Sequence, residues 1–213
     1  MARNKYPEIT ENRILDAATK LFWEKGYEQT TIQDIVDALG DLSKGAIYHH
    51  FKSKDDIVNA VCDHITAEIN PFDKIKNAPG WNGFQKIRQL FLLSLSNKKQ
   101  REMFHLFPSL LKNPRFLTQT VEECISMAPM LQEIIEEGNA DGSLSITYPQ
   151  QAAETILLLV NVWINPIVFS VSREEFTLKL RYLADFLDNL GLHIIDEEVW
   201  AAAIDFRDSI ITQ

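Results

Sequence analysis

The spacing of the apolar residues constrains this chain more than any other feature of its sequence. Apolar residues recur every three or four positions, as they do in an amphipathic helix, and no segment sustains the alternation that a half-buried β-strand needs. Near the N-terminus, this spacing is carried by Ile14, Ala17, Ala18, Leu21 and Phe22. No internal repeat stands out. The sequence therefore predicts an all-α protein.

Glycines divide the first sixty residues into short helices. Gly26 and Gly40 each follow the last apolar position of a helix, where a left-handed residue is favourable. Thr31, with Asp34 three residues later, is typical of a capped helix start, and Ser43 can cap the next helix. Two short helices joined by a glycine-bearing turn predict a helix-turn-helix unit.

The second helix of this unit lies in a basic stretch of an acidic protein. Residues 42–54 contain three lysines and two histidines but no acid, although the whole chain has a formal net charge of -9. A local cluster of this kind indicates a surface that contacts a polyanion. The overall composition, 46% hydrophobic and 24% charged, is that of an ordinary globular protein.

The two segments that carry these signals resemble the DNA-binding domain of the tetracycline-repressor (TetR) family. They are Thr30–Ile35 and Ser43–Lys54, and the second agrees with the family pattern at nearly every position. The chain departs from the pattern in one place. Asp41 and Leu42 both stand between the turn glycine and the capping serine, where the family usually has one residue.

The resemblance covers about residues 10 to 60 and implies two functional domains. Residues 1–52 are then the helix-turn-helix DNA-binding domain, and residues 53–213 form an all-helical domain for ligand binding and dimerisation. The resemblance also implies a double-stranded DNA operator as the main partner.

The expected DNA contacts come from three neighbouring helix starts. Gly45 lets the basic helix approach DNA closely, while Tyr48 and His49 can hydrogen-bond phosphate oxygens. Lys44 can reach a base edge or a phosphate, and Lys54 resembles the family's phosphate-gripping lysine. The full expected set is Thr31, Gln33, Ser43, Lys44, Gly45, Ala46, Tyr48, His49, Lys52 and Lys54.

Two further basic features have alternative interpretations. Arg3, Lys5 and Arg13 either form an arm that follows the DNA groove or lie in a solvated tail. Lys52 either contacts DNA or belongs to a solvated helix face. The sequence does not decide between these alternatives.

The histidines and cysteines do not indicate a metal site. His49 and His50 are neighbours, so on a helix their side chains point about 100° apart and cannot chelate one ion. The remaining histidines and cysteines also lack ligand spacing: His64, His105, His193, Cys62 and Cys124. No phosphate loop or nucleophile motif is present either. We expect no metal, no cofactor and no enzymatic activity, and we expect reduced cysteines.

Two consecutive helices in the second half are predicted to form a homodimer interface. The first spans residues 149–170, and its stretch from Ala152 to Phe169 is apolar nearly all the way round, so it must be buried on both sides. The second, residues 173–191, has a matching apolar stripe. The alternative is that the first of these helices is the central helix of a monomeric core.

A small-molecule site is expected in the second domain, among the helices that contain three internal prolines. Pro108, Pro129 and Pro166 interrupt helical patterns, and kinked helices leave space between them. Nearby residues offer an apolar lining with a few polar groups. The candidates are Phe104, His105, Phe107, Asn161, Trp163 and Asn165. The alternative is that these side chains are ordinary core. That an unknown effector binds here follows mainly from the family resemblance.

The sequence predicts no membrane span and a cytoplasmic location. Its N-terminus is polar, and the most apolar stretch, residues 155–171, is interrupted by two asparagines and a proline. We expect a ligand-responsive repressor that binds a palindromic operator as a homodimer. The alternatives are an activator, a regulator controlled by a protein partner and, least favoured, an all-helical enzyme.

Overall fold

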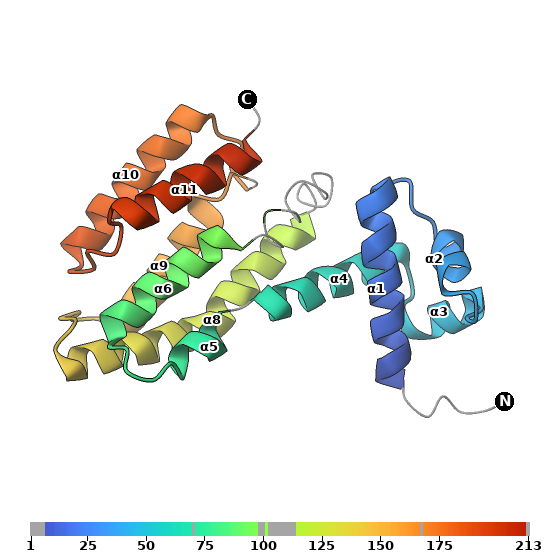
Figure 1. The fold of residues 1–213 in the computed structure, drawn as a ribbon, viewed down its shortest axis with the longest axis horizontal. Helices are drawn as coiled ribbons and strands as arrows, with labels where there is room; N and C mark the ends of the chain where they lie inside the picture. The colour runs from blue at the N-terminus through green and yellow to red at the C-terminus, as the bar shows by residue number, and fades with distance from the viewer. Residues whose placement is uncertain (1–6, 70, 98–100, 102–113, 167, 212–213) are drawn as a thin grey trace. The chain divides into compact units, whose positions relative to one another are not determined.

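The computed structural model describes residues 7–69, 71–97, 101, 114–166 and 168–211, and every regular element in these ranges is a helix (Figure 1). The prediction of an all-α protein is confirmed. No helix among these residues is long and apolar enough to cross a membrane.

The chain forms two compact units, residues 1–69 and 70–213. The helix that begins at Lys54 therefore clusters with the first unit. The predicted boundary between the DNA-binding domain, residues 1–52, and the helical domain, residues 53–213, stays a prediction.

The first unit consists of four helices: α1 (Pro7–Lys25), α2 (Ile32–Leu39), α3 (Lys44–His50) and α4 (Lys54–Ile69). Each helix contributes apolar side chains, spaced by three or four residues, to one shared core. The buried members include Ile14, Ala18, Phe22, Ile35, Ile47, Ile57 and Val61. Each such large side chain stabilises the unit by about 1.5–3 kcal/mol, so a core of this size can hold short helices in place.

Capping residues fix the bounds of α2 and α3. The Asp34 amide donates to Thr31 Oγ1 over 3.1 Å, and the Thr31 amide donates to Asp34 Oδ2 over 2.8 Å. This reciprocal pair is a capping box. Gly40 ends α2 with a left-handed φ of 72°. Ser43 Oγ then accepts from the Ala46 amide over 3.2 Å and starts α3 after a very short turn.

The second unit contains the remaining helices, of which α10 and α11 run side by side (Figure 1). They are α5 (Phe72–Lys76), α6 (Gly83–Ser96), α8 (Pro114–Asp141), α9 (Pro149–Leu158), the π-helical turn η2 (Leu159–Trp163), α10 (Arg173–Asn189) and α11 (Glu197–Ile210). The sequence pattern also predicts a helix over residues 99–111, and this segment lies, apart from Arg101, outside the described residues.

The α6 and α8 helices meet at two glycines. A Cβ atom added to Gly83 would lie 2.4 Å from the Cα of Gly138, so the backbones approach too closely for any side chain. Beside this crossing, the buried Lys86 donates to both carboxylate oxygens of Glu137 over 2.6 and 2.7 Å. The ion pair satisfies a lysine that would be costly to bury alone.

The helix predicted over residues 149–170 changes its hydrogen bonding after Leu158 and ends at Trp163, so the predicted C-terminal end at residue 170 is wrong. The Ile164 amide donates to the Leu159 carbonyl, five residues back, which is the pattern of a π-helix. The Asn161 side chain donates to the carbonyl four residues back over 3.0 Å and competes with the α-helical ladder. Pro166 has no N–H with which to continue the helix.

Candidate nucleic-acid interface

Four of the predicted DNA contacts lie together on α3. Lys44, Gly45, Tyr48 and His49 are all exposed, whereas Ile47 is fully buried in the core of the first unit. The four positions follow the helical period and therefore share one face. The first turn of α3 contains no acidic residue. The core thus holds one side of α3 and leaves a basic, polar side for a partner.

No contact with the described residues requires a glycine at position 45. A Cβ atom added there would meet only Ser43 Oγ, at 3.8 Å, which is ordinary van der Waals contact. Gly45 also lies inside a helix, where glycine is unfavourable relative to alanine by about 0.5–1 kcal/mol. The open space over Gly45 suits the close approach of a partner. The neighbouring predicted contacts Ser43 and Ala46 form the cap of α3.

Two predicted contacts at the start of α2 already take part in local hydrogen bonds. The Thr31 hydroxyl donates to Asp34 Oδ2 over 2.8 Å, and the exposed Gln33 donates to Asp37 over 2.9 Å. Asp34 also accepts from Lys25 over 2.7 Å. The Lys25 bond, followed by the bonds from Thr31, lowers the pKa of Asp34 from 3.8 to about 2.

Lys54 faces into the first unit. Its ammonium group donates to the backbone carbonyls of Tyr27 and Thr30 over 3.0 and 3.1 Å, and it lies 4.1 Å from the centre of the Tyr27 ring. The Tyr27 hydroxyl donates to Asp55. Burial and then this hydrogen bond raise the pKa of Tyr27. Lys54 therefore fastens the start of α4 to the link between α1 and α2, and its phosphate contact stays a prediction.

The other basic candidates have varied surroundings. Lys52 has an exposed side chain, and its backbone amide donates to Asp56 over 3.1 Å. Arg13 donates to Asp41 over 2.7 Å and lowers the pKa of that carboxyl. Asp41 is one of the two turn residues that set this chain apart from the usual pattern. Arg13 and Asp41 are 28 positions apart in the chain, so no local sequence pattern predicts their ion pair. Arg3 and Lys5 lie outside the described residues.

Two of the predicted ligand residues line a cavity in the second unit. Asn161 and Asn165 face it, together with residues of α6, α10 and α11. The contribution of α11 to this cavity was not predicted, because α11 comes last in the chain and carries no polar signal of a site. Three other candidates, Phe104, His105 and Phe107, lie outside the described residues.

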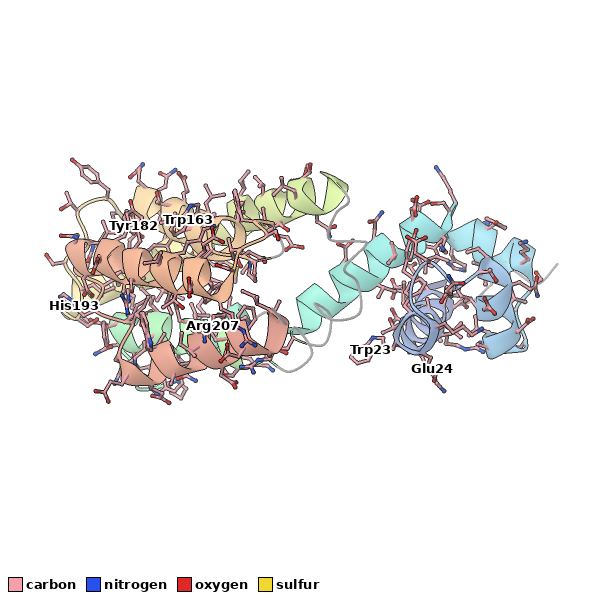
Figure 2. All side chains as sticks on the ribbon, turned by 90° about the horizontal axis from the view of Figure 1, so that it is seen from above. Trp23, Glu24, Trp163, Tyr182, His193 and Arg207 are labelled. Carbon is pink, nitrogen blue, oxygen red and sulfur yellow. The ribbon has the colours of Figure 1, made fainter. Side chains whose placement is uncertain are left out.

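Trp163, the remaining ligand candidate, is not part of this cavity wall. Its ring packs against Tyr182 with centroids 5.4 Å apart (Figure 2). Its carbonyl accepts from Lys179 over 2.6 Å, and the Lys179 ammonium also lies 4.4 Å from the centre of the Phe169 ring. Burial lowers the pKa of Lys179. Trp163 thus joins an aromatic cluster between η2 and α10.

Cys124 is a buried thiol without a disulfide partner. It donates to the Leu157 carbonyl over 3.6 Å, and burial raises its pKa to about 11. The thiol therefore stays protonated at neutral pH and is a poor nucleophile or metal ligand. Within the described ranges, no group of three acidic, histidine or cysteine side chains is placed to hold a metal ion.

A short basic helix, exposed on one face and joined by a tight turn to the helix before it, defines a helix-turn-helix DNA-binding protein. Residues 14–61 match the family model described as bacterial regulatory proteins, tetR family. Residues 113–186 match the tetracyclin repressor-like C-terminal domain. The chain belongs to the TetR family of DNA-binding transcriptional regulators, which are not enzymes.

Individual relatives agree with this assignment. The chain is 29% identical over 144 residues to the HTH-type transcriptional repressor KstR2 of Mycolicibacterium smegmatis, covering 64% of this chain and 68% of that protein. It is 50% identical over 48 residues to KstR2 of Rhodococcus jostii, but this match spans only 23% of that relative. A crystal structure of a TetR/AcrR-family regulator from Thermobifida fusca superposes with a TM-score of 0.56 at 26% identity, covering 83% of this chain and 97% of that one.

Proposed function

We propose that this protein is a cytoplasmic repressor that binds a palindromic operator as a homodimer and leaves it when a small molecule binds the second unit. The exposed face of α3, with open space over Gly45, is the observation that carries the DNA-binding part. A helix of this kind enters the major groove, where side chains reach base edges and phosphates. Repression is supported by the name of the KstR2 relatives.

The surroundings of the predicted contact residues support different roles for them in DNA binding. Lys44, Tyr48 and His49 have exposed side chains that can reach the DNA directly. Thr31 and Gln33 are positioned by their bonds within α2 and suit contacts to the backbone beside the groove. Lys54 holds the α1–α2 link in place, and a phosphate contact would require it to exchange one carbonyl for a phosphate oxygen.

Exposed apolar side chains support a dimer through helices 149–170 and 173–191. Leu158 and Phe169 in the first segment are 41% and 45% exposed, and Leu178 and Tyr182 in the second are 62% and 58% exposed. Large apolar groups gathered on neighbouring segments favour burial against a partner. A second copy of the chain presents the same surface, as a two-fold interface requires.

Release by an effector requires that the effector bind the DNA-incompetent state more tightly than the DNA-bound state. A tenfold loss of operator affinity needs about 1.4 kcal/mol of such preference. The cavity lies beside η2, in the segment that also carries part of the proposed dimer surface. An effector that binds in the cavity can therefore change the position of that surface.

Footprinting on the DNA that flanks the protein's own gene tests the proposal. We expect two symmetric protected half-sites about one helical turn apart, and lower expression from a reporter carrying them. Absence of protection would overturn DNA binding by α3. Protection combined with raised reporter expression would identify an activator instead.

A further inference from the structure

We infer that the cavity between α6, η2, α10 and α11 binds a small neutral molecule: a single ring or short alkyl chain that carries a hydroxyl group. This inference names the chemical class of the effector. It rests on the proposed function for the effect on DNA, but the binding itself can be measured without DNA.

Among the residues that the structure describes, those lining the cavity are mostly apolar, and none of them carries a charge. Twelve of the lining side chains are apolar: Phe91, Leu95, Val160, Ile164, Pro166, Phe176, Leu180, Leu183, Ile195, Val199, Ala203 and Phe206. The other three are Ser94, Asn161 and Asn165. A charged ligand would lose its hydration here without meeting an opposite charge, and this desolvation excludes it.

The size of the cavity limits the ligand. Its volume is about 80 Å³, within an empty region of about 660 Å³ that is partly open to solvent. Protein interiors are close-packed, and few voids exceed the size of a water molecule. A water needs about 10–15 Å³ of such space, so the cavity suits a compact chemical group of a few atoms. The side that is open to solvent leaves room for a longer part of the ligand.

The polar groups in the wall favour a ligand that donates a hydrogen bond. The Ser94 hydroxyl donates to the Phe91 carbonyl over 2.8 Å, which leaves its oxygen as an acceptor. The Asn161 amide nitrogen donates to the Leu157 carbonyl over 3.0 Å, so its side-chain oxygen is likewise an acceptor. A hydroxyl group on an otherwise apolar molecule satisfies such an acceptor without adding charge.

The π-helical turn explains why a polar residue stands in this wall. The extra residue per turn in Leu159–Trp163 rotates the side chains that follow relative to a continuous α-helix. Val160 and Asn161 then face the cavity, while Trp163 packs on Tyr182 outside it. Such turns are frequent at functional sites.

Calorimetry and thermal melting of the full chain with four matched monosubstituted benzenes test the inference. They are benzyl alcohol, toluene, benzoate and benzylammonium, which differ only in one substituent. We expect benzyl alcohol to bind and raise the melting temperature, and toluene to bind about tenfold more weakly, because it lacks one hydrogen bond. Benzoate and benzylammonium should show no measurable binding.

Three variants locate the site. Ala203→Leu fills the cavity from α11 and should abolish binding of benzyl alcohol and toluene alike. Asn161→Leu removes the acceptor at similar size and should bring the affinity ratio of benzyl alcohol to toluene close to one. Asn189→Leu is the matched control, because Asn189 also donates to the carbonyl four residues back, over 2.7 Å, but lies outside the cavity. It should keep the tenfold ratio.

Several results would overturn the inference: no binding of any of the four compounds, equal binding of benzoate, unchanged binding in Ala203→Leu, or an unchanged ratio in Asn161→Leu. If these compounds fail while a different molecule releases the protein from its operator, the proposed function stands and this site is wrong. If benzyl alcohol binds as expected but operator binding is absent, the site stands and the proposed function fails.

Discussion

Two lysines, Lys52 and Lys54, lie two positions apart in the same basic stretch and have different surroundings. The Lys52 side chain is exposed, whereas the Lys54 ammonium donates to two backbone carbonyls of the first unit. From the sequence, both are candidate DNA contacts: Lys54 because it resembles a lysine of the family, and Lys52 with a solvated helix face as the alternative. The difference depends on where the link between α1 and α2 lies in space, and no local sequence pattern predicts the position of this link.

Lys54→Ala should therefore destabilise the protein. We expect its free energy of unfolding to fall by about 1–3 kcal/mol, because buried carbonyls lose a charged donor. Lys52→Ala should change it by less than about 0.5 kcal/mol. Urea denaturation followed by circular dichroism measures both, and equal effects of the two substitutions would show that the Lys54 contacts do not stabilise the fold.

The capping carboxylate Asp34 makes α2 sensitive to acid. Because its folded pKa of about 2 lies below the ordinary 3.8, its contribution to stability is present above the ordinary value and is lost as pH falls towards 2. Over this pH window, the melting temperature of Asp34→Asn should therefore fall less than that of the wild type. Asp16→Asn removes an exposed carboxyl from α1 and controls for the change in net charge. An unchanged acid profile in Asp34→Asn would contradict this account.

Among the elements, the crossing of α6 and α8 depends on glycine in a way that α3 does not. Gly83→Ala would place a Cβ atom 2.4 Å from the Gly138 backbone. We expect the free energy of unfolding of the second unit to fall by about 1–3 kcal/mol or more. Gly45→Ala, a matched change in a helix with open space, should leave stability unchanged or slightly higher and weaken operator binding. Thermal melts and DNA-binding titrations of both variants separate the two effects.

Helix positions could be predicted from the sequence where capping and apolar spacing agree. The Thr31 capping box, the left-handed Gly40 and the Ser43 cap were all expected from local pattern, and the structure contains each of them. The π-helical turn Leu159–Trp163 was not expected. It results from competition between side-chain and backbone hydrogen bonds, to which apolar spacing is insensitive.

For the molecule as a whole, the proposed dimer rests on the apolar side chains that one copy leaves exposed. Leu178→Glu should convert the dimer into a monomer and abolish operator binding, while the melting temperature of the monomer stays close to that of the wild type because Leu178 is 62% exposed. Ala201→Glu adds the same charge at an exposed position of α11 and should leave the dimer intact. Light scattering that shows a wild-type monomer at micromolar concentration would remove the dimer proposal.

Among the residues that the structure describes, the cavity that we propose as the effector site contains only two of the six ligand residues predicted from the sequence. Asn161 and Asn165 do face a cavity, but the helix that closes it, α11, lies forty residues or so further along the chain. Which helices pack around a space depends on the tertiary arrangement. Prolines and polar residues within apolar helices indicate that space exists, and they do not say which other helices enclose it.

Operator affinity measured against salt concentration tests the central claim, that the exposed face of α3 contacts DNA. Affinity should fall linearly on a log–log plot, with a slope of about -0.9 for each neutralised phosphate. If Lys44 contacts a phosphate, Lys44→Ala should make the slope shallower by about 0.9. If Lys44 contacts a base edge instead, the substitution should weaken binding at all salt concentrations. Lys20→Ala, an exposed lysine of α1, should match the wild type. Wild-type affinity that does not change with salt, or Lys44→Ala titrations that coincide with those of the wild type, would contradict the account.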